Sequence, residues 1–182
     1  MDVRVSACAV VPAVLSLAAC TPAVKERPAP TAVDVRAGHT EANEAVVRRS
    51  FQAREQGDVA TLNELSDPEE TLHPPNGPPV RRGGPYTELK DLCPMCAALE
   101  HRKITIDMML AEGDLVYVRS TWTGSYTGTF QGVAVSGRDV TIVYSNVYRV
   151  VDGRIRDNWF VSDRLSLAEQ LGMKLVRADA AR

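Results

Sequence analysis

Residues 140–162 have the sequence VTIVYSNVYRVVDGRIRDNWFVS, and this stretch decides the fold. Two runs rich in Val, Ile and aromatic residues flank the pair Asp152-Gly153. An Asp-Gly pair between such runs is a strong signal for a tight β-hairpin turn. We therefore predict a long strand over residues 140–151 and its antiparallel partner over residues 154–162.

Two further strands are predicted before this hairpin. Apolar and polar residues alternate over residues 104–110 and again over 115–123, with a Gly-Asp turn pair at 113–114 between them. Alternation with a period of two is the pattern of a half-buried strand. A glycine-containing loop is expected over residues 124–137, and a short helix over 165–173 closes the domain.

The first part of the domain has helical patterns instead. We predict a helix over residues 41–56 with Thr40 as its N-cap, followed by a short helix over 59–65. Phe51 falls on the buried face of the longer helix, whereas Arg54 is expected to face water. These two helices precede all four predicted strands along the chain.

The segment between the helices and the strands is rich in breakers of regular structure. Prolines and glycines make residues 72–86 loop-like, and Pro94 interrupts a helical composition over residues 87–99. Helices followed by consecutive antiparallel strands indicate an α+β fold, a cone-shaped curved antiparallel sheet wrapped around the N-terminal helices. The hollow of such a sheet is a natural ligand site.

Composition limits the classes of function. The chain has 182 residues, a formal net charge of −2, 45% hydrophobic and 24% charged residues, typical of one soluble globular domain. The near balance of charges argues against a nucleic-acid partner, which usually requires a basic surface. We expect no metal and no cofactor.

An export signal is predicted at the N-terminus. Residues 5–19 carry no charge, yet the run is shorter than the roughly twenty apolar residues that span a bilayer. The motif Leu-Ala-Ala-Cys that ends at Cys20 resembles the lipobox of bacterial lipoproteins. This resemblance implies removal of residues 1–19, acylation of Cys20 and anchoring to the outer side of a bacterial cell membrane. An ordinary signal peptide cleaved elsewhere, or a misassigned start codon, is the alternative.

The rest of the chain divides into three parts. The Pro-rich residues 20–40 form a tether, residues 41–173 the domain, and residues 174–182 a flexible tail.

Several motifs in the domain resemble the SnoaL-like polyketide cyclase family. The likeness covers about residues 41–173, is densest from Lys103 onward, and rests on the order and spacing of the motifs. They are AEGD at 111–114, GSYTG at 124–128, FQG at 130–132, SGRDVT at 136–141, YRVVDGRI at 148–155 and QLG at 170–172. The resemblance implies the cone-like fold of nuclear transport factor 2, scytalone dehydratase and ketosteroid isomerase, and a homodimer through the outer face of the sheet.

The usual acid/base groups of the resembled cyclases are missing. In that family a pocket aspartate directly follows the tryptophan of the last strand, and a His or Asp often lies one strand earlier. Here Phe160 follows Trp159, and Asn146 falls on the second position. Neither replacement can exchange a proton near neutral pH.

Two other residues are candidates for proton transfer. The resembled family often has a histidine near the pocket where His73 falls, and an imidazole can act as a base near neutral pH. A loop histidine bonded to backbone is the alternative for His73. Asp163 follows the last strand, where it is either a proton-transfer group or the N-cap of the closing helix.

Aromatic and amide residues on the strands predict a pocket wall for a small hydrophobic molecule. The alternative for each of them is ordinary core packing. The predicted ligand-binding residues are Trp122, Tyr126, Tyr144, Asn146, Tyr148 and Phe160. Three functions are then open: a binder of a small molecule, an isomerase, hydratase or cyclase that uses His73, and a protein–protein adaptor.

The pair Cys93 and Cys96 is not expected from the family. An exported location favours a disulfide between them. A redox-active dithiol, a metal site completed by other ligands and two buried thiols are the alternatives.

Overall fold

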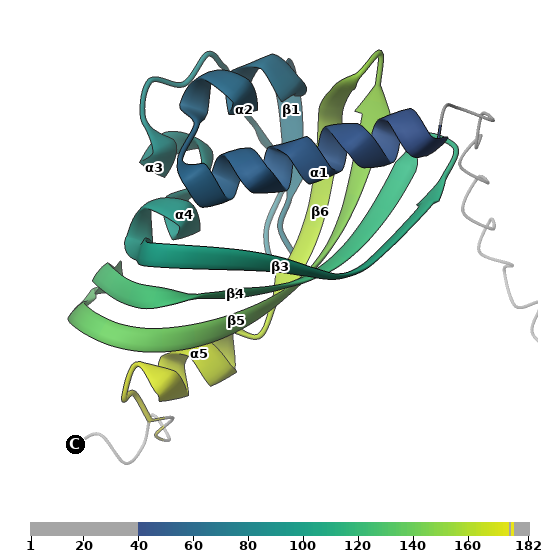
Figure 1. Cartoon of the computed structure of the whole chain (residues 1–182). Coiled ribbons are helices and arrows are strands. Elements are labelled where there is room, and N and C mark those ends of the chain that lie inside the picture. The colour runs from purple at the N-terminus through teal and green to yellow at the C-terminus, as the bar shows by residue number, and fades with distance from the viewer. Residues whose placement is uncertain (1–39, 175, 177–182) are drawn as a thin grey trace, which may run out of the picture. The chain divides into compact units, whose positions relative to one another are not determined.

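The computed structural model describes residues 40–174 and 176, and these form a curved sheet with helices packed on its concave face (Figure 1). The predicted signal at 1–19, Cys20 and the rest of the tether before Thr40, and most of the tail at 174–182 lie outside the described residues. Among the described helices, none is both long enough and apolar enough to cross a bilayer.

Five helices and six strands make up the described part of the chain. The helices are α1 (Thr40–Gln56), α2 (Val59–Leu65), α3 (Leu89–Leu92), α4 (Pro94–Ala98) and α5 (Arg164–Gln170). The strands are β1 (Ser66–His73), β2 (Val80–Arg81), β3 (Leu99–Glu112), β4 (Leu115–Phe130), β5 (Val133–Val151) and β6 (Arg154–Ser162).

The sheet has the strand order β2-β1-β6-β5-β4-β3. All neighbouring strands are antiparallel except β1 and β6, which run parallel. The four strands predicted from the sequence, β3 to β6, are antiparallel as predicted, and the parallel pair involves β1, which was not among them. Strand β1 is separated from β6 by most of the domain, so no local turn sets their direction.

The hairpin at the centre of the sequence argument is confirmed. Strand β6 has the predicted bounds and pairs antiparallel with β5. Asp152 and Gly153 both have positive φ, 52° and 74°, as the two central residues of a type I′ turn require.

The glycine-containing loop expected over residues 124–137 is wrong for most of its length. Strand β4 continues through Gly124 to Phe130, and β5 begins at Val133. A Cβ at Gly124 would lie 2.8 Å from the backbone oxygen of Glu100 on β3, so this glycine permits close strand contact rather than a loop.

The loop expected over residues 72–86 also contains regular structure. Strand β1 extends to His73, and the two residues of β2 pair with it at Thr71 and Leu72. Both β2 residues are exposed at the edge of the sheet, where prolines nearby are tolerated.

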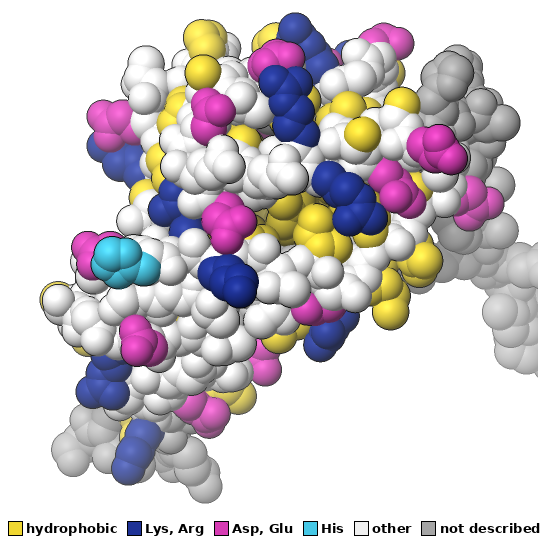
Figure 2. All heavy atoms as spheres, viewed as in Figure 1, with side chains coloured by type: hydrophobic (Ala, Val, Ile, Leu, Met, Phe, Trp, Pro, Cys, Tyr) yellow, Lys and Arg dark blue, Asp and Glu magenta, His cyan; other side chains and the backbone are white. Residues whose placement is uncertain are grey.

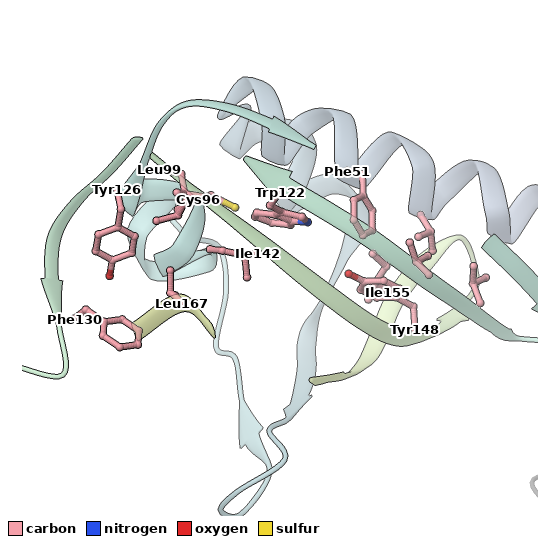
Figure 3. Packing of buried hydrophobic residues seen from close by; sticks show 14 of the residues in the cluster. Phe51, Cys96, Leu99, Trp122, Tyr126, Phe130, Ile142, Tyr148, Ile155 and Leu167 are labelled. Atoms are coloured by element: carbon pink, nitrogen blue, oxygen red, sulfur yellow. The ribbon is translucent and has the colours of Figure 1, made fainter. Parts of the chain in front are cut away.

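The core joins α1 to the concave face of the sheet. Figure 3 shows Phe51 of α1 between Trp122 and Tyr148 of the strands. Its ring centroid lies 6.4 Å from that of Trp122 and 6.0 Å from that of Tyr148, both edge to face.

Arg54 corrects a prediction made from charge alone. Instead of facing water it is only 5% exposed, and its Nη1 donates a 2.7 Å hydrogen bond to the Ser50 hydroxyl. Its guanidinium lies 5.7 Å from the ring centre of Phe51 and 5.9 Å from that of Tyr148. The last turn of α1 lies over the hollow of the sheet, so this side chain points inward.

Charges of both signs are mixed over the face of the domain drawn in Figure 2, with no basic stripe. A hydrophobic patch is open to the surface between α1 and β3 on this face (Figure 2).

Candidate functional site

A cavity of about 230 Å³ lies between the concave face of the sheet and the helices; we call it the inner cavity. Five of the six predicted ligand-binding residues line it, namely Trp122, Tyr144, Asn146, Tyr148 and Phe160. The three β5 residues are two apart and therefore point to one face of the sheet. Phe160 is opposite Asn146 in the register of β5 and β6, which brings it to the same wall.

Tyr126 is the predicted ligand residue that does not line the inner cavity. It is buried in the core, packs edge to face against Phe130, and donates its hydroxyl to the Thr129 carbonyl at 3.3 Å. Figure 3 shows it near Phe130 and away from Phe51 and Tyr148. For this residue the core-packing alternative fits the structure.

The sheet wall of the inner cavity carries a few neutral polar groups. The Asn146 amide donates a 3.0 Å hydrogen bond to the Asn158 side-chain oxygen, and Asn158 also lines the cavity. Burial raises the pKa of Tyr144 to about 12, against a weaker opposite effect of a hydrogen bond with Ser162. Tyr144 is therefore a neutral phenol at physiological pH and can donate a hydrogen bond to a ligand.

A charged cluster reaches the inner cavity through one of its residues. It consists of Glu70 on β1, Arg82 just after β2, and Tyr86; Arg82 lines the cavity. The Arg82 backbone N–H donates a 2.7 Å hydrogen bond to the Glu70 carbonyl, and the Arg82 guanidinium lies 5.7 Å from the centre of the Tyr86 ring. Burial lowers the pKa of Arg82, an effect that the negative charge of Glu70 opposes.

The polar atoms of this cluster are buried without hydrogen-bond partners. Six buried side-chain nitrogen or oxygen atoms of the described residues lack such a partner, and four of them are here: both Glu70 carboxylate oxygens, Arg82 Nη1 and the Tyr86 hydroxyl. Buried polar atoms in proteins are almost always hydrogen bonded. Arg82 is the member of this cluster that lines the cavity, so its Nη1 is the candidate ligand-binding group.

Sequence reasoning missed this cluster for a definite reason. Glu70, Arg82 and Tyr86 lie in or beside a segment rich in Pro and Gly, which predicts a solvated loop. Only the pairing of β1 with β2 and β6 turns this segment inward. The one local signal was Glu70, a charged residue two positions before Leu72. Leu72 itself lines the cavity.

His73 is not brought to the inner cavity. Its Nε2 lies 2.8 Å from the Asp157 carboxylate, and its ring stacks on Trp159 with centroids 4.4 Å apart. Both it and Trp159 line a separate depression that includes Val147 and Val161. Trp159, Val147 and Val161 alternate along their strands with the residues of the inner cavity, so the depression is on the outer face of the sheet. The predicted homodimer through that face stays a prediction.

Asp163 caps helix α5. Its carboxylate accepts a 2.8 Å hydrogen bond from the Ser166 backbone N–H, and its side chain is exposed. It does not line the inner cavity, so its position fits the N-cap alternative and not proton transfer there.

Cys93 and Cys96 form a disulfide. Cys93 lines the inner cavity with Pro94 and Met95, whereas Cys96 is fully buried in the core. The disulfide thus fixes the turn that carries one wall of the cavity. Within residues 40–174 and 176, no group of three or more His, Cys, Asp or Glu side chains is placed to hold a metal ion.

Comparisons with known proteins agree with this architecture. A family model described as SnoaL-like polyketide cyclase matches residues 44–171. The solved structure of IdmH, a proposed polyketide cyclase from Streptomyces antibioticus, is 28% identical and has a TM-score of 0.57, covering 72% of this chain and 99% of that chain. A search of curated proteins gives no match.

Two more distant structures share the fold. A proposed SnoaL-like polyketide cyclase from Jannaschia sp. CCS1 is 19% identical with a TM-score of 0.62, covering 75% of this chain and 95% of that chain. AclR, a proposed hydroxylase from Streptomyces galilaeus, is 20% identical with a TM-score of 0.62, covering 78% of this chain and 92% of that chain. The predicted α+β fold with a curved sheet and packed helices is confirmed.

Proposed function

The chain belongs to the SnoaL-like polyketide cyclase family, and on that premise we propose that its domain binds a small, flat and mostly hydrophobic molecule in the inner cavity. The observation that carries the proposal is the Arg82 Nη1 atom, which has no hydrogen-bond partner and belongs to a residue lining a cavity that also has four aromatic side chains in its lining. Aromatic side chains suit a flat ligand. A guanidinium favours a planar group with acidic oxygens, such as a carboxylate or a phenolate.

The position of the neutral residues supports binding in preference to the usual cyclase chemistry. Phe160 and Asn146, which replace the acid/base groups of the resembled cyclases, both line the inner cavity. A ligand in the cavity would therefore meet an aromatic ring and an amide there. Neither of these side chains moves a proton at physiological pH.

We expect naphthoate, a flat aromatic acid, to bind the wild-type domain at least about tenfold more tightly than the Arg82→Gln variant, because a hydrogen bond to a charged group contributes about 1.5–3 kcal/mol. Titration calorimetry measures both dissociation constants. The matched control is Arg81→Gln, since the neighbouring Arg81 side chain is 72% exposed. Equal naphthoate affinity in the wild type and Arg82→Gln would contradict the proposed role of Arg82. Failure of the wild type to bind the acid at all would contradict the ligand class.

We also propose that the domain is held at the outer side of a bacterial membrane by lipid on Cys20. The support is the sequence Leu-Ala-Ala-Cys at 17–20 after an uncharged run. Two acyl chains on one residue give firm anchoring, whereas one chain binds only marginally. The Pro-rich residues that follow would keep the domain clear of the lipid surface.

Cys20→Ser is expected to release the protein from the membrane fraction of a bacterial host almost completely, because residue 20 then has no thiol to acylate. Fractionation followed by detergent phase partitioning measures the effect. Cys8→Ser is the control, since it lies in the segment predicted to be removed and should leave anchoring intact. Membrane retention of Cys20→Ser equal to that of the wild type would rule out the anchor.

A further inference from the structure

We propose that the disulfide between Cys93 and Cys96 is a redox switch in the wall of the inner cavity, opened by external thiols at Cys93. The reaction partner is a small dithiol, which is oxidised as the bond opens. The inference rests on the proposed binding function only for its effect on ligand affinity, because the exchange step depends on the geometry of the cysteine pair alone.

The two cysteines differ in their access to solvent. Cys93 is half-buried and lines the inner cavity, whereas Cys96 is 0% exposed and belongs to the hydrophobic core (Figure 3). Exchange begins when a thiolate attacks one sulfur of the bond, so it requires access to that sulfur. This difference makes Cys93 the attacked residue and Cys96 the residue whose sulfur leaves.

The backbone around the pair favours negative charge on Cys93. Cys93 is the N-cap of α4, and its sulfur accepts a 3.2 Å hydrogen bond from the Cys96 backbone N–H. A hydrogen bond to a charged acceptor is stronger than one to a neutral acceptor. The same N–H therefore stabilises Cys93 as a thiolate, which lets it leave again when the exchange is completed.

The exchange is balanced between the dithiol and the protein. One thiolate of the dithiol forms an S–S bond to Cys93, the Cys93–Cys96 bond breaks, and Cys96 leaves with the electron pair and takes up a proton. The second thiol of the same molecule loses its proton and attacks the sulfur bound to Cys93, which is released and protonated in turn. The dithiol is oxidised to a cyclic disulfide, and the protein bond is reduced to two thiols.

Contacts other than the disulfide anchor this segment to the core. Leu92 and Leu99, which flank the pair, are each 1% exposed. Arg102 Nη1 donates a 3.0 Å hydrogen bond to the Cys96 carbonyl. The bond closes a loop of only four residues, and in the chain-entropy model short loops gain the least stability from a cross-link. We therefore expect the reduced domain to stay folded.

The two residues between the cysteines are the part of the wall that the bond constrains. Pro94 and Met95 both line the inner cavity, and Met95 is only partly buried against the core. They follow α3, which has four residues, and begin α4, which has five. Helices this short are not stable by themselves. Opening the bond gives both residues more conformations, which a ligand must order again when it binds.

A matched pair of variants tests the assignment of Cys93. Both are made in the full chain with Cys8→Ser and Cys20→Ser, so that each keeps one thiol. Cys93, left by Cys96→Ala, should react with 4,4′-dithiodipyridine at least about tenfold faster than Cys96, left by Cys93→Ala, because a core thiol reacts only after local opening. The absorbance of the released thiopyridone gives both rates. Equal rates, or faster reaction of Cys96, would overturn the assignment.

Hydrogen exchange of the wild-type protein tests the switch without any ligand. Reduction by dithiothreitol should speed amide exchange over residues 93–98 at least about tenfold and leave residues 140–151 of β5 within about twofold. A chain with both Cys93→Ala and Cys96→Ala should exchange like the reduced wild type, with or without dithiothreitol. Unchanged exchange over residues 93–98, or unfolding of the whole domain on reduction, would overturn the proposal.

Calorimetry with naphthoate separates this inference from the binding function. The reduced protein should bind naphthoate about three- to tenfold more weakly than the oxidised protein, because two lining residues must be ordered again. Equal affinity in the two states would overturn the switch. Absence of naphthoate binding in both states, together with faster exchange over residues 93–98 on reduction, would contradict the binding function and leave the switch standing.

Discussion

Replacing Phe51 with alanine is expected to destabilise the domain by about 3–5 kcal/mol, because a large aromatic side chain in a closed core leaves a cavity that the surroundings fill only partly. Phe51 is 3% exposed and is the aromatic residue through which α1 packs on Trp122 and Tyr148. Its loss also removes the ring beneath the Arg54 guanidinium. Chemical denaturation followed by circular dichroism measures the free energy of unfolding.

Leu165→Ala is the control for Phe51→Ala. Leu165 is also a large hydrophobic residue on a helix, α5, but it is 47% exposed, so its truncation should cost well under about 1 kcal/mol. A loss below 1 kcal/mol for Phe51→Ala would show that α1 is held on the sheet by other contacts. The positions of Trp122 and Tyr148, which line the inner cavity, would then not depend on packing against α1.

The strands could be predicted because their signals are local. Alternation of apolar residues and the Asp152-Gly153 turn fix β6 to its observed bounds, and the same alternation places Tyr144, Asn146 and Tyr148 on one wall. Each of these inferences needs only neighbouring residues in the chain. The sheet wall of the site was accessible to sequence reasoning for the same reason.

The opposite end of the site could not be predicted because it depends on contacts between distant segments. Strand β1 pairs in parallel with β6, and its Thr71 is opposite Asp157 across the sheet. Parallel pairing requires a crossover and leaves no turn signature. Without it, Glu70 and Arg82 are charged residues in an apparent loop, and Arg54 is a charged residue on a helix.

His73 is a second residue whose position depends on the pairing of distant segments. The resemblance placed a histidine near the pocket, but the register His73 to Trp159 puts its ring on the outer face. A change of one residue in strand register exchanges the two faces of a sheet. Family position alone therefore does not decide which cavity a side chain serves.

A double-mutant cycle on Glu70 and Arg82 should give a coupling free energy of about 2–3 kcal/mol. Arg82→Met alone is expected to cost about 3 kcal/mol near neutral pH, because it leaves the buried Glu70 charge with Arg54 as the remaining nearby cation. Glu70→Gln alone should change stability little or raise it, since it removes a buried charge whose oxygens have no hydrogen bond. The double variant should recover most of the loss.

The direction of the Glu70→Gln effect separates a functional charge from a structural one. If Glu70 and Arg82 served mainly to hold β1 and the following loop together, removal of either partner would cost a similar amount, and Glu70→Gln would lower the midpoint of unfolding. A group kept for binding or proton transfer is instead a local cost to the fold, as is common at functional sites. Arg81→Met controls for loss of a surface charge, because the Arg81 ion pair with Glu69 is exposed and contributes little. Similar losses for Glu70→Gln and Arg82→Met, with no further loss in the double variant, would assign the cluster to structure alone.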